Sequence, residues 1–204
     1  MRVDQVDQVD QVDRVDRVDQ VDQVGAGWGR LGRVGLVTAL VVLGARAVGA
    51  QEQTPEAKLA ALGISLPAVD KPIANYVKAV RTGNLVFTSG HGPCGPLPPD
   101  QKGKVGTDLT IEQGAAAARA TGICLLATLK AELGSLSRVK RIVKVLGMVN
   151  AGPAFADQPK VMNGFSDLMV AVFGDRGRHA RSAVGMASLP GDMAVEIEMV
   201  VEVE

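Results

Sequence analysis

Residues 179–204 read HARSAVGMASLPGDMAVEIEMVVEVE, and this stretch carries the clearest fold signal in the chain. Two strand-like runs, 180–187 and 193–201, flank SLPGD, a composition typical of a turn. In the second run the odd positions from Val195 to Val203 are apolar, and most of the positions between them are glutamate. Alternation with period two indicates a half-buried strand whose odd-numbered side chains meet the core. The stretch therefore predicts a closing β-hairpin.

Arg181 is a fixed positive charge in a run that is otherwise small or apolar. If the hairpin pairs its two runs directly, Val184 and Met186 join the core, and Arg181 and Glu196 share the opposite face. Arg181 then lies opposite about residue 200, with Glu196 roughly 13 Å along the sheet. A face of small residues with no helix over it needs cover, and we expect a second copy of the chain to provide it.

The sequence before this stretch alternates strand and helix patterns. It predicts, in order, a hairpin of Asn75–Val80 and Leu85–Ser89, a loop over 92–106, a helix over Thr110–Leu133 ended by Gly134, a strand within 137–151 and a helix within 157–174. The order β-β-α-β-α-β-β is typical of an α+β domain with a mixed sheet and two helices on one face.

The first quarter of the chain has a different character. Residues 1–29 consist mostly of seven copies of Val-Asp-Gln or Val-Asp-Arg, whose period of three fits neither helix nor strand and predicts a disordered tail. Residues 30–50 are basic, then apolar, then small, the order of a signal peptide, with an uncleaved anchor as the alternative. We expect a domain at 51–204 that is exported to the periplasm or secreted, or cytoplasmic if the signal is not used.

Composition excludes several classes of function. The chain has 22 basic and 22 acidic residues and 3% aromatic residues, which argues against a nucleic-acid partner. The two histidines and two cysteines have no metal-ligand spacing, so we expect neither metal nor cofactor. A disulfide between Cys94 and Cys124 is possible in an oxidising compartment, but the simpler prediction is that Cys124 is a small buried apolar residue. The domain at 51–204 is not expected to have a membrane partner.

Several motifs together resemble one known family. ANYVKAV and TGNLVFTSG, the helix NGFSDLMVAVFG and the ending ARSAVGMASLPGDMAVEIEMV are similar to the RidA family, also called YjgF, UK114 or L-PSP. The resemblance covers roughly residues 60–203 and implies a chorismate-mutase-like fold and a homotrimer with ligand clefts between subunits. It also implies hydrolysis of enamine or imine intermediates such as 2-aminoacrylate to 2-keto acids and ammonia, as a 2-iminobutanoate/2-iminopropanoate deaminase does.

The same resemblance implies roles for individual residues. Arg181 matches the arginine that binds the carboxylate of the imine, enamine or keto acid, and Glu196 matches the glutamate that positions or activates the attacking water. The other implied pocket residues are Tyr76, Ser89, His91 and Asn163. Ala183 replaces a common cysteine and His91 a common glutamine, which favours a branch apart from the tested deaminases.

Plainer roles remain for these residues. Arg181 could form an ion pair between subunits with Glu198 or Glu202, and Glu196 could be one of a solvated row of glutamates. Ser89 and His91 could form a nucleophile and base, although no third member of a triad is in view. The alternative functions are a trimer that binds small carboxylates without turnover and, least favoured, an endoribonuclease.

Overall fold

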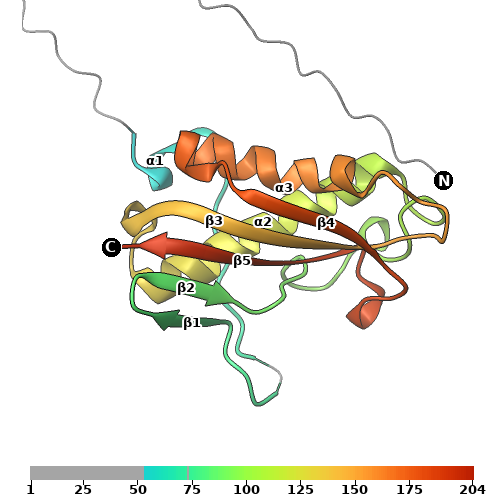
Figure 1. The fold of residues 1–204 in the computed structure, drawn as a ribbon, viewed down its shortest axis with the longest axis horizontal. Coiled ribbons are helices and arrows are strands. Elements are labelled where there is room, and N and C mark those ends of the chain that lie inside the picture. The colour runs from blue at the N-terminus through green and yellow to red at the C-terminus, as the bar shows by residue number, and fades with distance from the viewer. Residues whose placement is uncertain (1–52, 73) are drawn as a thin grey trace, which may run out of the picture. The chain divides into compact units, whose positions relative to one another are not determined.

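The computed structural model of this chain describes residues 53–72 and 74–204 (Figure 1). The predicted repeat tail (1–29) and signal segment (30–50) lie outside the described residues. The principal elements are α1 (Pro55–Ala61), β1 (Ala79–Thr82), β2 (Leu85–Thr88), α2 (Ile111–Leu133), β3 (Val139–Asn150), α3 (Gln158–Phe173), β4 (Ala180–Met186) and β5 (Val195–Val203). No helix within the described ranges is long and apolar enough to cross a membrane.

The long helix α2 begins and ends where the sequence predicts. The Thr110 side chain accepts a hydrogen bond from the Gln113 backbone N–H at 3.2 Å, and the Gln113 side chain accepts one from the Thr110 N–H at 2.8 Å. This reciprocal pair is a capping box, which satisfies N–H groups that the first turn leaves without partners. Gly134 ends the helix with φ of 79°, a conformation that favours glycine.

The remaining helices show one prediction confirmed and one element missed. Helix α3 covers Gln158–Phe173, ends at Gly174 as predicted, and buries Val161 and Phe165 completely. Helix α1 was not predicted. It begins at Thr54, whose hydroxyl accepts from the Ala57 N–H at 3.2 Å, with proline at the first helical position.

The sheet has five strands in the order β1-β2-β5-β3-β4; in Figure 1 α2 crosses behind the sheet and α3 runs beside its β4 edge. The first hairpin is confirmed, although β1 begins at Ala79 rather than at residue 75. The predicted closing hairpin is wrong. Strand β4 pairs in parallel with β3, and β5 lies between β2 and β3 and is antiparallel to both. The reason is the β3-α3-β4 crossover, which returns the chain parallel to β3 at the sheet edge.

The predicted faces are correct for β5 and wrong for β4. The odd-numbered residues of β5, from Val195 to Val203, are all buried, as expected. In the parallel register, however, Arg181 aligns with Val145, a fully buried residue on the helix side of β3. Arg181 therefore faces the helices, and Val184, 39% exposed, faces the open side. The small residues of β4 lack the apolar alternation that would have identified its faces.

Candidate functional site

The Arg181 guanidinium lies between edge strand β4 and helix α3. Its Nη1 donates to Asn163 Oδ1 at 3.1 Å and to Ser166 Oγ at 2.9 Å, and its Nη2 donates to the Pro159 carbonyl oxygen at 3.3 Å. All three acceptors are neutral, and within residues 53–72 and 74–204 no ion pair engages Arg181. A guanidinium held by neutral groups keeps its charge available for an external anion, which it can bind in bidentate fashion.

Ser166 also connects Arg181 to a histidine. His179 Nε2 is 3.1 Å from Ser166 Oγ, and His179 Nδ1 is 2.7 Å from the Gly177 carbonyl oxygen. Burial lowers the pKa of His179, the Gly177 carbonyl partly opposes that shift, and the charge of Arg181 adds to it. A cavity of about 340 Å³ opens here and is lined in part by Ser166, His179 and Arg181. Ser166 and His179 were not among the predicted site residues, although Ser166 lies three residues after Asn163 in α3 and His179 lies two residues before Arg181.

A second group of predicted residues gathers beyond the end of β2. Tyr76, Ser89, His91 and Glu196 all line a cavity of about 500 Å³. Tyr76 precedes β1 and is 47% exposed, Ser89 and His91 follow β2, and Glu196 projects from β5. The structure thus brings together four of the six predicted pocket residues here, and it pairs the other two, Arg181 and Asn163, elsewhere.

Glu196 has the electrostatic properties expected of a base. Burial raises the pKa of its carboxyl, and repulsion from Glu198, two residues further along the same face, raises it further. Its carboxylate makes no hydrogen bond or ion pair within the described part of the chain. The side chain lies over Gly90, where a Cβ would collide with Glu196 Oε1. Gly90 therefore leaves the space that the carboxylate occupies.

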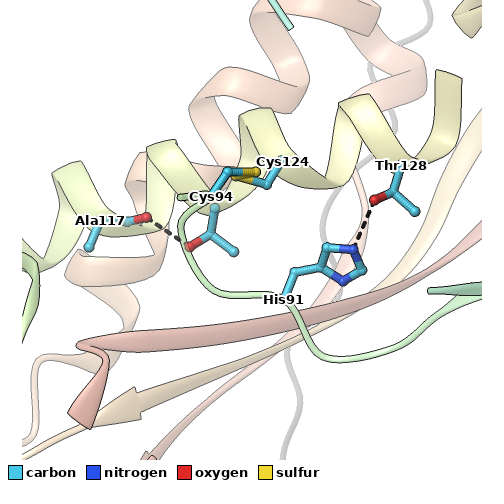
Figure 2. Close-up of a disulfide and its surroundings, with 6 residues drawn as sticks. His91, Cys94, Ala117, Cys124 and Thr128 are labelled. Atoms are coloured by element: carbon cyan, nitrogen blue, oxygen red, sulfur yellow. Dashed lines mark hydrogen bonds between the residues drawn. A yellow bond between two sulfur atoms is a disulfide. The ribbon is translucent and has the colours of Figure 1, made fainter. Parts of the chain in front are cut away.

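His91 is not available as a base for Ser89. Its Nδ1 bonds the Ser89 carbonyl oxygen at 2.8 Å. Its Nε2 bonds Thr128 Oγ1 at 2.9 Å, as Figure 2 shows. Burial lowers the pKa of His91, an effect that the Ser89 carbonyl opposes and Lys78 supports. The Ser89 hydroxyl donates instead to the Lys78 carbonyl oxygen at 3.4 Å. The alternative of a Ser89–His91 nucleophile and base is therefore wrong.

A disulfide joins Cys94 to Cys124 at the wall of the same cavity, with 5.7 Å between the Cα atoms (Figure 2). The prediction of an unpaired Cys124 is corrected. The loop after β2 folds back along α2, so that His91 and Cys94 meet residues one helical turn apart, Thr128 and Cys124. This tertiary path has no local signal in the sequence.

The sequence profile of the family described as "YjgF/chorismate mutase-like, putative endoribonuclease" matches residues 56–202. The chain belongs to this family. The fold agrees, since the predicted α+β architecture with two helices on one face of a mixed sheet is the one observed. Groups of three or more His, Cys, Asp or Glu side chains that could hold a metal are not found among the residues described.

Two solved structures and one sequence relative illustrate membership of the YjgF family. Protein TCP17 of Trypanosoma cruzi is 46% identical over 147 residues, which cover 72% of this chain and 92% of TCP17. The Agrobacterium tumefaciens protein Atu1372, of unknown function, is 40% identical with a TM-score of 0.67, covering 74% and 92% of the two chains. A "putative endoribonuclease" from Shewanella oneidensis is 32% identical with a TM-score of 0.71, covering 74% and 100%.

In this YjgF-family chain the two candidate catalytic residues lie apart. Arg181 aligns with Val145, which pairs with Met199, so β3 separates the strands that carry Arg181 and Glu196. Two strand spacings and three residues of rise place their Cα atoms roughly 14 Å apart. Glu196 also faces the open side of the sheet, whereas Arg181 faces the helices. The prediction that they share a face is wrong, and the two candidate residues belong to separate cavities.

Proposed function

We propose that this YjgF-family chain hydrolyses reactive enamines and imines of the 2-aminoacrylate type to 2-keto acids and ammonia, in clefts between the subunits of a homotrimer. The strongest support for this function is that a carboxylate-binding group and a candidate base lie in two separate cavities of the chain. One place offers the Arg181 guanidinium, with no carboxylate partner in the described ranges, and the other offers Glu196, whose pKa is raised. The proposed cleft forms where the Arg181 cavity of one subunit meets the Glu196 cavity of the next subunit of a cyclic trimer.

The proposed reaction needs little beyond these two groups. Arg181 binds the substrate carboxylate, and the amide oxygen of Asn163 holds the guanidinium. Glu196 accepts a proton from water as the water oxygen bonds to the imine carbon. That proton passes to the nitrogen of the imine, which is the tautomer of the enamine, and a carbinolamine forms. The hydroxyl proton of the carbinolamine then moves to its amine as the carbon–oxygen double bond forms and the carbon–nitrogen bond breaks, so that ammonia and a 2-keto acid leave. The raised pKa brings the glutamate nearer to the working pH, where a general base is more effective.

The open face of the sheet supports self-association. It carries large apolar side chains that water reaches in the single chain: Val80 is 54% exposed, Phe87 41% and Val184 39%. Cross-strand pairs bring Val80 and Phe87 together and place Phe87 beside Val200. An apolar surface of this kind is typical of a contact with another protein surface. Sedimentation equilibrium of the full chain tests the assembly, and a monomer would contradict the cleft between subunits.

The activity is tested with 2-aminoacrylate generated by a second enzyme and detection of the pyruvate and ammonia released. We expect the parent to accelerate release and Arg181→Ala and Glu196→Gln to lose it. The matched controls are Lys130→Ala, an exposed cation on α2 outside the Arg181 cavity, and Glu202→Gln on the same face of β5. Equal rates for Arg181→Ala and the parent would overturn the proposal. Pyruvate binding that needs Arg181, without any release, would indicate a non-catalytic carboxylate binder.

Mixed trimers test whether one site draws on two subunits. Arg181→Ala and Glu196→Gln proteins are unfolded together in equal amounts, refolded and assayed. Random cyclic assembly restores both groups at roughly a quarter of the sites, so activity should return to about that fraction. A double variant mixed with either single variant restores no site and serves as the control. No recovery from the first mixture would contradict a shared site.

Export is also part of the proposal. Disulfides persist in oxidising compartments, so the Cys94–Cys124 bridge supports use of the signal segment at 30–50. Amino-terminal sequencing of the protein isolated from its own cells tests this. A terminus near Gln51 is expected, and a terminus within the repeat would contradict cleavage.

An endoribonuclease remains the alternative suggested by the family description. Ribonuclease catalysis commonly uses a histidine as base, and both His91 and His179 have their ring nitrogens engaged within the chain. We expect purified protein to leave RNA intact. Cleavage that survives in Glu196→Gln would favour the ribonuclease.

A further inference from the structure

We infer that Ser166 and His179 are positioning residues that fix the direction in which Arg181 presents its N–H groups to a substrate carboxylate. The inference rests on the proposed function, because it assumes that Arg181 binds a carboxylate. Neither residue belongs to the pocket that the sequence predicts. Both act through Arg181 rather than on the substrate.

A continuous chain of hydrogen bonds carries the inference. It begins at the Gly177 carbonyl oxygen, 2.7 Å from His179 Nδ1, and continues from His179 Nε2 to Ser166 Oγ at 3.1 Å. It ends at Arg181 Nη1, which donates to Ser166 Oγ at 2.9 Å. The chain joins the turn before β4, helix α3 and strand β4, so three elements determine the position of one guanidinium.

The direction of each proton follows from the chemistry of the groups. A carbonyl oxygen only accepts, so His179 Nδ1 carries the ring proton. In the neutral ring Nε2 then accepts, and it takes the single proton of the Ser166 hydroxyl. That leaves the lone pairs of Ser166 Oγ for the Arg181 N–H. Every member of the chain has one role, and a chain ordered in this way is stiffer than its separate bonds.

The surroundings of His179 favour the neutral ring. The Phe165 ring meets the imidazole edge to face, with the centroids 5.8 Å apart. The charged groups at this cavity are Asp167 of α3 and two arginines, Arg178 and Arg181. Arg178 is paired with Asp175 at 3.2 Å, and burial and Arg181 both lower the pKa of His179. The imidazole can therefore act as an acceptor at neutral pH.

The consequence for binding is one of orientation. An arginine side chain has several rotatable bonds, and ordering it when the ligand binds costs free energy. Ser166 and Asn163 hold Nη1 and the Pro159 carbonyl holds one N–H of Nη2, all from the α3 side, which leaves the Nε N–H and the second Nη2 N–H to meet the ligand. Without His179 the Ser166 hydroxyl loses its fixed direction, and Arg181 loses part of its support. Affinity for the carboxylate should then fall while the water and Glu196 are unaffected.

The test compares four variants of the full chain. We expect Ser166→Ala and His179→Leu to raise KM for 2-aminoacrylate, and Kd for pyruvate, roughly tenfold to a hundredfold, with kcat within about twofold, as for loss of one hydrogen bond to a charged group. His179→Gln keeps a side-chain acceptor and should stay within about threefold of the parent. Lys130→Gln, which removes an exposed charge on α2 outside this cavity, should change neither constant. Unchanged KM and Kd in both Ser166→Ala and His179→Leu would overturn the inference.

A ligand-free measurement separates this inference from the proposed function. Nitrogen-15 NMR should show His179 as the tautomer protonated at Nδ1. It should also show that rotation of the Arg181 guanidinium is slowed in the parent and in His179→Gln, and that this slowing is lost in His179→Leu. If the parent neither binds pyruvate nor hydrolyses 2-aminoacrylate, the proposed function fails and this spectrum decides the positioning roles. An Arg181 guanidinium signal that is the same in the parent and in His179→Leu refutes the positioning roles. This comparison decides the question even if the Ser166→Ala protein misfolds.

Discussion

Reduction of the Cys94–Cys124 disulfide should destabilise the domain by an amount that the chain separation sets. The two cysteines are 30 residues apart. Closing a loop of that length removes entropy from the unfolded chain worth about 3.7 kcal/mol at 25 °C. For a domain of this size such a loss lowers the thermal midpoint by roughly 7–15 °C. We therefore expect the free energy of unfolding in urea to fall by about 3–4 kcal/mol when reductant is added.

The measurement is equilibrium urea unfolding of the full chain, followed by circular dichroism with and without reductant, with thiol titration to confirm reduction. Reduction leaves every side-chain volume in place, so the loss reports the cross-link rather than packing. The matched control is the Cys94→Ala/Cys124→Ala double variant, whose stability should not respond to reductant. If the fully reduced parent unfolds at the same urea concentration as the oxidised one, the loop-closure reasoning is refuted.

Three further predictions follow from single side chains. Gly90→Ala should move the Glu196 carboxylate aside, because the added Cβ would meet Glu196 Oε1. The free energy of unfolding should change by less than about 1 kcal/mol, while kcat falls on the order of a hundredfold. An unchanged kcat would contradict the role of that carboxylate. Glu196→Gln should be more stable than the parent at pH 7, because the raised pKa of Glu196 in the folded state means that the parent loses stability as pH rises through that pKa. In urea unfolding the stability difference between variant and parent should vanish below about pH 4, where the glutamate is protonated in both the folded and the unfolded state. Gly164→Ala should destabilise the domain by about 1–3 kcal/mol in the same assay, because its Cβ would meet the backbone carbonyl of Ala115 in α2, and a neutral result would mean that α3 shifts freely.

Local chemistry in the sequence was sufficient for the two long helices, α2 and α3, and for the faces of β5. Thr110 and Gly134 define the ends of α2 because capping depends on residues within a few positions of one another. The alternation of apolar residues and glutamates in β5 identified its buried side, because it too depends only on residues close together in the sequence. Strand order is not local. The SLPGD turn exists, with Gly191 at φ of 61°, yet its arms lead to strands separated by β3.

The candidate site shows the same limit. The family resemblance identified Arg181 and Glu196, but only the fold revealed that they face different sides of the sheet. Ser166 was within reach of sequence reasoning, since it lies three residues after Asn163 on one face of α3. The Cys94–Cys124 bridge could not be predicted from the sequence, because it depends on the path of the loop after β2 along α2.

The insertion of β5 has a consequence for biogenesis. A ribosome makes β2 and β3 before β5, which pairs with both of them, so neither strand can complete its hydrogen bonding on that side until β5 emerges. The nascent polypeptide consequently carries an open edge on β2 once residue 88 is made and a second on β3 once residue 150 is made, and it cannot complete its sheet before β5 emerges. Under the export proposed above, the chain would reach a translocase before its sheet is complete.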